Sequence, residues 1–418
     1  MSQLRFLRVT NEERRKEGLC SFCQGHRLLC GKSPCPRLAE ALALAGIGKA
    51  LRQRKLQGSS PPAAFVGSWG YPKVLAGPLV PPLPRTDTAV MDAPELWLGK
   101  TMEEVLHYRF TLIRGKSRIP VEAARDPPRL LATLQETAMA SKPAETEVWF
   151  TKEPRPGLFL SPRAAPLGPS APLERLRLAE NPSVSKAVEY VVSDRDLRAA
   201  QAAVRLFEAG IPVTQVTRLL SVGLLGVQRQ RRLVPTEWSI TAVDDLLSRA
   251  LHRRVLDYPQ VNEFMLFGAQ GFDNNVQVLL MPSPWMFEAL EAWLTTSSPT
   301  VGSDYELTWG RATYAQNLAG AYYAARLPIL EYLERTRRQA AALAFLEVGA
   351  GWIPVGVWRL RELCREALRQ PPLRLETLDE SLRALSGRLR LPLARWTQVS
   401  RLLGLRRRQR GLEAYLLM

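Results

Sequence analysis

Four cysteines near the N-terminus form the clearest chemical pattern in this sequence. They are spaced C-x2-C-x6-C-x4-C in "CSFCQGHRLLCGKSPC", at Cys20, Cys23, Cys30 and Cys35. Four thiolates complete the tetrahedral shell of a structural Zn²⁺, and soft sulfur ligands select zinc or an iron–sulfur cluster over harder ions. The pattern predicts a small zinc module with no open position for catalysis. An iron–sulfur cluster and disulfides are the alternatives, because a proline follows the last cysteine and some hyperthermophile proteins hold disulfides inside the cell.

Carboxylates in the C-terminal half form a second candidate group. Asp244 and Asp245 are adjacent, and further glutamates follow at Glu263, Glu288 and Glu291. Such oxygens could coordinate Mg²⁺ or Mn²⁺ for phosphodiester hydrolysis. The aspartate pair also fits the first turn of a helix capped by Thr241, where negative charge is favoured. Because the sequence contains no established catalytic motif, it does not decide whether the chain is an enzyme.

The charge balance points to an anionic partner. The net charge is +17 and the isoelectric point is near 10.1, which suits nucleic acid, acidic proteins or anionic membranes. Arg229, Arg231 and Arg232 lie close to Trp238, a combination that suits phosphate contact with base stacking. The segment is therefore a candidate DNA-binding surface, with an ordinary solvated edge as the alternative.

The elements expected to position these residues belong to an α+β fold. Helical and extended segments occur in mixed order, which favours helices and strands around a largely antiparallel sheet. Residues 1–57 are expected to form the zinc module and a helix, and 58–180 a strand- and proline-rich part of the body. Residues 181–400 are expected to form the remaining α+β part, and 401–418 a basic tail. Within the body, "SPWMFEALEAWL" predicts a helix opening at Ser283 and Pro284, and "AALAFLEV" predicts a strand.

The sequence shows no sign of a membrane protein. It contains no uninterrupted apolar run of roughly 18 residues, and its N-terminal segment lacks the apolar run and cleavage site of a secretory signal. We therefore expect a cytoplasmic protein associated with the nucleoid and no membrane partner.

Five segments in order along the chain carry a resemblance to a known family. They are "CSFCQGHRLLCG", "FVGSWGYPKVLAGP", "VPTEWSITAVDD", "GAYYAARLPILEYLERTRRQ" and "PVGVWRLRE". Together they resemble the Nre family of archaeal DNA-repair proteins. The resemblance implies a role in the response to DNA damage, a four-cysteine zinc-finger-like segment matching the cysteines above, and, as in many members, a C-terminal motif for the PCNA sliding clamp. It implies no catalytic residue.

The clamp motif implied by the resemblance has a match in the last ten residues, "QRGLEAYLLM". Its pattern is a glutamine, an aliphatic residue three positions later, and two bulky apolar residues after three more. Gln409, Leu412, Tyr415 and Leu416 have this spacing. One tight helical turn would gather the three apolar side chains into a plug for a hydrophobic pocket. Leu416 stands where a second aromatic residue is common, which weakens the plug.

Three functions are consistent with these features. The leading hypothesis is a DNA-repair factor recruited by PCNA, with a zinc finger and a basic DNA-binding surface. A metal-dependent nuclease or phosphohydrolase acting on damaged DNA through Asp244 and Asp245 is the second. An RNA-binding zinc protein of translation is the third, and it leaves the terminal motif unexplained.

Overall fold

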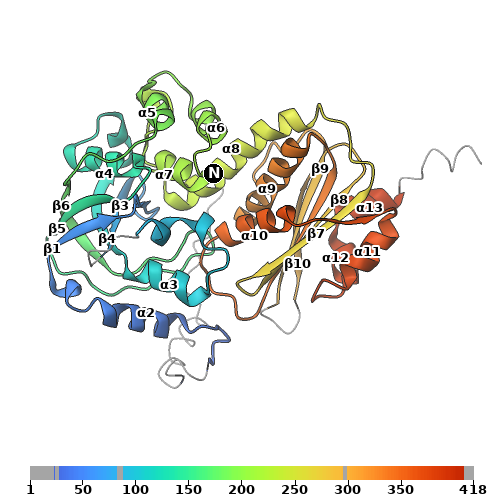
Figure 1. Cartoon of the computed structure of the whole chain (residues 1–418), viewed down its shortest axis with the longest axis horizontal. Helices are drawn as coiled ribbons and strands as arrows, with labels where there is room; N and C mark the ends of the chain where they lie inside the picture. The colour runs from blue at the N-terminus through green and yellow to red at the C-terminus, as the bar shows by residue number, and fades with distance from the viewer. Residues whose placement is uncertain (1–22, 24–27, 82–87, 295–298, 409–418) are drawn as a thin grey trace, which may run out of the picture.

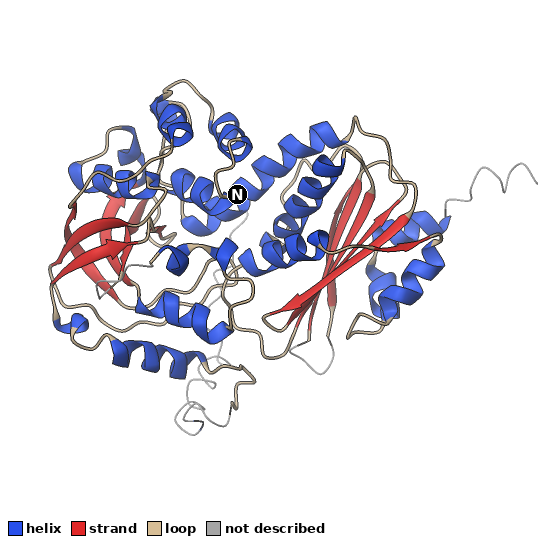
Figure 2. Cartoon of the chain, in the orientation of Figure 1, coloured by secondary structure: helices blue, strands red, loops and turns tan. Residues whose placement is uncertain are grey.

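The computed structural model describes Cys23 and residues 28–81, 88–294 and 299–408. Two six-stranded sheets lie at opposite ends of the molecule, with helices between and around them (Figures 1 and 2). The α+β prediction is confirmed, but the single sheet that we expected is wrong because the strands divide into two. Neighbouring strands are antiparallel except for β4 with β6 and β9 with β11.

The first sheet has the strand order β1-β5-β6-β4-β3-β2. Its strands are β1 (Lys55–Ser60), β2 (Ala64–Val66), β3 (Lys73–Val80), β4 (Ile113–Pro120), β5 (Ala144–Phe150) and β6 (Ser170–Leu178). One face carries Val74, Ile119 and Val148, which pack into the main core together with residues of the neighbouring helices. Alternating burial along β5 shows the period of two expected when only one face of a sheet is covered.

Helices surround this sheet and lead away from it. They are α2 (Pro36–Gly46), α3 (Met102–Thr111), α4 (Arg129–Met139), α5 (Lys186–Ser193), α6 (Ala199–Glu208) and α7 (Val213–Ser221). The start of α3 shows how local sequence fixes an element: Thr101 and Glu104 cap each other's backbone N–H groups in a capping box. The long α8 (Thr236–Val255) then runs from the first sheet to the second (Figure 1).

The second sheet has the strand order β10-β9-β11-β8-β7-β12. Its strands are β7 (Phe264–Gly271), β8 (Asn274–Met281), β9 (Met286–Trp293), β10 (Val301–Glu306), β11 (Ala341–Val348) and β12 (Leu373–Leu375). Its two faces are covered by α9 (Gly320–Thr336) and α10 (Trp358–Arg369) on one side, and by α11 (Leu378–Ser386), α12 (Leu393–Val399) and α13 (Arg401–Arg408) on the other. The predicted strand at "AALAFLEV" is β11, and it is buried along its whole length.

The predicted helix at "SPWMFEALEAWL" is wrong, because Met286–Trp293 is the strand β9. Its two faces pack into different hydrophobic clusters, with Phe287 and Ala289 facing α9 and Leu290 and Ala292 facing α12 and α13. A strand buried on both faces loses its polar–apolar alternation, so its sequence can imitate a helix.

A single hydrophobic core joins the two sheets through α7 and α8, since Val74 of the first sheet and Val278 of the second belong to the same cluster of contacting side chains. Within the described residues, none of the helices combines the length and the apolar character needed to cross a lipid bilayer.

Candidate functional site

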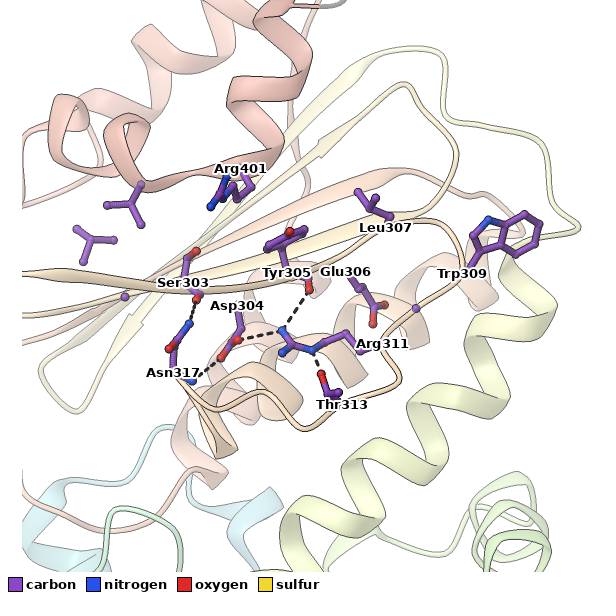
Figure 3. Close-up of a pocket in the computed structure, with 14 residues that line it drawn as sticks. Ser303, Asp304, Tyr305, Glu306, Leu307, Trp309, Arg311, Thr313, Asn317 and Arg401 are labelled. Atoms are coloured by element: carbon purple, nitrogen blue, oxygen red, sulfur yellow. Dashed lines mark hydrogen bonds and ion pairs between the residues drawn. The ribbon is translucent and has the colours of Figure 1, made fainter. Parts of the chain in front are cut away.

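An open polar groove of about 1030 Å³ lies along β10 and the loop that follows it (Figure 3). A smaller adjoining pocket of about 310 Å³ is bounded by α8 and α9. Two segments that carry the family resemblance therefore meet here, because "VPTEWSITAVDD" opens α8 and "GAYYAARLPILEYLERTRRQ" forms α9. Trp309 stands at the loop between β10 and α9, with 88% of its surface exposed.

Asp304 holds the loop against the strand. One oxygen of its carboxylate accepts from the Arg311 guanidinium at 2.9 Å, and the other accepts the backbone N–H groups of Asn317 and Leu318 at 2.9 and 2.8 Å. The Asn317 side chain donates to the carbonyl of Ser303 at 2.8 Å. Figure 3 shows Asp304, Arg311 and Asn317 pointing toward one another. Because Asp304 accepts from three donors, it serves to fix the loop.

Glu306 lies at the base of the adjoining pocket and is almost fully buried. Its carboxylate accepts from Trp285 Nε1 at 2.8 Å, from the Tyr322 hydroxyl at 2.9 Å and from Arg326 Nε at 2.8 Å. Burial, together with the Glu306 charge, raises the pKa of Tyr322. These donors stabilise a buried carboxylate, which would otherwise be costly to desolvate.

His252 adds a neutral imidazole to the wall of this pocket. Burial and the nearby Arg326 guanidinium lower the pKa of His252. Its Nε2 lies 2.9 Å from the Thr308 carbonyl oxygen. A carbonyl can only accept, so Nε2 carries the proton and Nδ1 keeps the lone pair.

Cations outnumber carboxylates around the adjoining pocket. Four arginines face two acids, the lining residues being Arg249, Arg253, Arg311 and Arg326 against Asp245 and Glu306. Three of these arginines are already paired: Arg249 with Asp245 at 2.8 Å, Arg326 with Glu306 at 2.7 Å, and Arg311 with Asp304 of the neighbouring groove at 2.9 Å. Among the described residues, Arg253 is the one of the four without a carboxylate partner, so the adjoining pocket offers an uncompensated guanidinium to an anionic group such as a phosphate.

The carboxylates considered as Mg²⁺ or Mn²⁺ ligands do not share a site. Asp244 is fully buried and pairs with Arg361 at 2.7 Å, whereas Asp245 lines the adjoining pocket. The three glutamates have separate partners: Glu263 pairs with Arg374, Glu288 accepts from Ser400 and two backbone N–H groups that follow it, and Glu291 is buried on β9. In the described part of the chain, no group of three or more histidine, cysteine or acidic side chains is placed to hold a metal ion.

The expectation that Asp244 and Asp245 open a helix is also wrong. Helix α8 begins at Thr236 with Pro235 as its N-cap, so the two aspartates lie in its middle. Burial raises the pKa of Asp244, and the Arg361 guanidinium acts in the opposite direction. Asp244 thus connects α8 to α10 as part of the body's buried structure.

The basic segment 229–232 divides into buried and exposed arginines. Arg231 is buried, and its guanidinium donates to the carbonyls of Gly226 at 2.9 Å and Val192 at 2.8 Å. Arg229 and Arg232 are exposed. Trp238 is exposed as well and contacts Tyr71, with ring centroids 5.5 Å apart. Only Arg229 and Arg232 of the three predicted arginines have side chains available to a phosphate.

The predicted zinc ligands and the terminal motif are described only in part. Cys20 and the motif residues Gln409, Leu412, Tyr415 and Leu416 lie outside the described residues. Cys23 is buried, and its sulfur accepts the backbone N–H of Leu29 at 3.4 Å, a contact that fits a thiolate. Cys35 is the N-cap of α2.

The groove residues were not found from the sequence. Glu306, Arg311 and Arg326 lie in three different elements, and their spacing matches no common motif. A signal was nevertheless present in "GAYYAARLPILEYLERTRRQ", where Tyr322 and Arg326 stand four residues apart and so lie on one face of a helix.

Comparison with known proteins gives matches along almost the entire chain. Residues 29–298 match the family model described as archaeal Nre, N-terminal, and residues 306–415 match archaeal Nre, C-terminal. The chain is 38% identical to DNA repair protein NreB of Archaeoglobus fulgidus over 400 residues, which cover 94% of this chain and 98% of the relative. It is 38% identical to NreA of the same organism, over 88% of this chain and 93% of the relative.

A third relative comes from a second organism. DNA repair protein NreA of Haloferax volcanii is 35% identical to 81% of this chain, a match that covers 84% of the relative. No solved structure matches the chain. Since both family models and all three relatives agree, the chain belongs to the archaeal Nre family.

Proposed function

We propose that this chain is an archaeal DNA-repair factor that binds DNA and is held at its site of action by the PCNA sliding clamp. The observation that carries the proposal is the similarity to relatives named DNA repair protein over 94% of the chain. The net charge of +17 supports attraction to the DNA backbone. Its place of action is the cytoplasm, at the nucleoid.

The clamp contact is assigned to Gln409, Leu412, Tyr415 and Leu416. These residues follow directly after α13, which is anchored to the body by the buried Leu402 and Leu403. The C-terminal family model extends to residue 415 and so includes most of the motif. A short motif on the end of an anchored helix keeps the body at a raised effective concentration near DNA.

The cysteines Cys20, Cys23, Cys30 and Cys35 are assigned to a structural Zn²⁺. The hydrogen bond from the Leu29 backbone to Cys23 fits this role, because backbone N–H groups stabilise thiolate ligands. Elemental analysis of the purified protein should find about one zinc per chain. Iron with visible absorption would instead assign the cysteines to an iron–sulfur cluster.

The tether is tested by measuring clamp binding of the full chain and of a Tyr415→Ala, Leu416→Ala variant. Removing two anchors from a hydrophobic pocket should weaken binding by about 100-fold or more. Glu413→Ala is the matched control, because it changes the same segment outside the motif and should bind as the unaltered chain does. Equal binding by all three proteins would refute the clamp assignment.

A further inference from the structure

Strand β4 presents a row of cations on one face of the first sheet. Arg114, Lys116 and Arg118 alternate along it, while Ile113, Gly115 and Ile119 between and beside them are buried. Alternate residues of a strand share a face, so the three cations lie side by side. Their burial falls along the strand, from a mostly buried Arg114 to an exposed Arg118.

These cations have no carboxylate partner within the described residues. The ion pairs described on this sheet are those of Glu147 on β5 with Lys55 and Arg177, and β6 separates β5 from β4. Arg114 donates to the Leu75 carbonyl at 3.0 Å, but its Nε has no hydrogen-bond partner in the part of the chain that the structure describes. Buried charges are normally paired, so this row lacks an anion.

Electrostatics around the row agree with this geometry. Burial lowers the pKa of Arg114 to about 10. Burial and the neighbouring Arg114 charge lower the pKa of Lys116. Both cations would be stabilised by a bound anion.

Exposed aromatic side chains stand beside the cations. Trp69 and Tyr71 belong to the turn between β2 and β3, and 69% and 47% of their surfaces are exposed. The Arg118 guanidinium lies 5.6 Å from the centre of the Trp69 ring. Gly70 has φ +83°, and a Cβ there would lie 2.9 Å from the Lys73 carbonyl oxygen, so the turn that presents the two rings requires glycine.

The start of α8 brings a third ring to this surface. Thr236 accepts the backbone N–H of Val66 at 2.9 Å, which attaches the helix to β2. Trp238, in the first turn of the helix, then contacts Tyr71. The exposed Arg232 is next to Leu233, whose N–H donates to the carbonyl of Val121 just beyond β4. We call this surface the stacking face, defined by Trp69, Tyr71, Arg114, Lys116, Arg118 and Trp238.

We propose that the stacking face binds single-stranded DNA, with the β4 cations on phosphates and the three rings on unpaired bases. Exposed rings beside a basic strand are the combination with which proteins hold single strands, because every base offers a face for stacking. In a duplex the base faces are covered by their neighbours, so the rings would gain little. This inference deepens the proposed function and rests on it for the choice of DNA.

The test uses the full-length protein and a fluorescently labelled oligothymidine of about 20 nucleotides, a length that exceeds the span of one stacking surface. Tyr71→Ala and Trp238→Ala should each weaken binding about tenfold. Tyr190→Ala is the matched control, because Tyr190 is 65% exposed on α5 and is not one of the six residues that define the stacking face. Tryptophan fluorescence of the unaltered chain should be quenched when the oligonucleotide binds.

The cation row is tested by the dependence of affinity on salt. Arg118→Ala should reduce the slope of log affinity against log salt by roughly 0.7, the value for one phosphate contact on a single strand. Arg383→Ala, an exposed arginine on α11, should leave the slope unchanged. Thermal unfolding of each variant shows whether it is folded.

Three results would overturn the proposal. They are duplex DNA binding as tightly as the single strand, an RNA oligomer binding more tightly than DNA, and Tyr71→Ala matching Tyr190→Ala. The clamp measurement separates this proposal from the proposed function. If the chain binds the clamp normally but does not bind oligothymidine through the stacking face, only the stacking-face proposal is refuted. If the chain binds oligothymidine but not the clamp, only the clamp assignment is refuted.

Discussion

Arginines serve opposite purposes on α10 and on β4. On α10, Arg361 pairs with Asp244 at 2.7 Å, and Arg365 pairs with Glu331 at 2.7 Å and Glu362 at 2.8 Å. On β4, Arg114 and Arg118 have rings beside them, and no carboxylate of the described residues pairs with either. Arg361 and Arg365 thus have their carboxylate partners inside the fold, whereas among the described residues no carboxylate pairs with the cations of β4.

This contrast teaches how to interpret a net charge of +17. The net charge does not distinguish an arginine that pairs with an acid inside the fold from one that is available to bind a phosphate. The distinction depends on whether an acid is packed beside it, and that is a property of the fold.

The largest effect on the free energy of unfolding is expected when the buried pair of Asp244 with Arg361 is broken. Asp244→Ala removes the closer of the two carboxylates paired with the buried Arg361 guanidinium, leaving Glu362 at 3.4 Å, and should lower the free energy of unfolding by about 3–5 kcal/mol. Asp245→Ala removes a surface pair with Arg249 and should cost less than about 1 kcal/mol. Thermal and denaturant unfolding of the two variants measure the difference.

The same pair of variants tests the metal hypothesis. If Asp244 and Asp245 were ligands of one catalytic ion, both substitutions would abolish metal-dependent cleavage to a similar extent. A stable Asp244→Ala protein would contradict the structural role of the buried pair.

An intermediate effect is expected within the basic segment 229–232. Arg231→Ala removes the donor to the Gly226 and Val192 carbonyls and should lower the free energy of unfolding by about 1–3 kcal/mol. Arg232→Ala should change it by less than about 0.5 kcal/mol and should weaken DNA binding at low salt. Equal stability of the two variants would remove the distinction between buried and exposed arginines here.

The smallest change in the free energy of unfolding, an increase instead of a decrease, is expected at β4. Arg114→Met replaces an unpaired, mostly buried cation by an apolar side chain of similar length. It should raise the free energy of unfolding by about 1 kcal/mol, while weakening oligothymidine binding. Calorimetry of the two proteins without DNA measures the gain, and a loss of several kcal/mol would show that Arg114 is a structural arginine.

The pKa of Arg114 gives this prediction a pH dependence. Its folded value of about 10 lies below its ordinary value. Between these two values the unfolded chain binds the proton and the folded chain does not, so the unaltered protein gains stability as pH rises through this range. The stability difference from Arg114→Met should therefore shrink at high pH.

The sequence predicted the regular elements better than the site. Helix α10 was predictable because amphipathic spacing dominates it, and strand β11 because it is a short apolar run. Strand β9 was not, because "MFEALEAW" consists of residues that favour helices and only its burial between two helical layers makes it a strand.

The site residues could not be predicted from the sequence for a different reason. Arg231 and Arg232 are neighbours of identical type, and only the fold buries one of them. The alternation of Arg114, Lys116 and Arg118 was visible in "RGKSR" and indicates a basic strand face. What the sequence could not provide was Trp238, which is more than 100 residues away and reaches this face only through α8.

The second sheet also determines how the chain can be divided. One family model ends at residue 298 and the other begins at 306, so the residues between them, 299–305, hold nearly all of β10, which is paired with β9. Strand β11, from the second segment, lies between β8 and β9 of the first. Neither segment can complete its sheet alone. Two fragments cut near residue 300 should therefore be insoluble when produced separately and should reassemble when co-expressed, so the chain offers a natural split site for a complementation reporter.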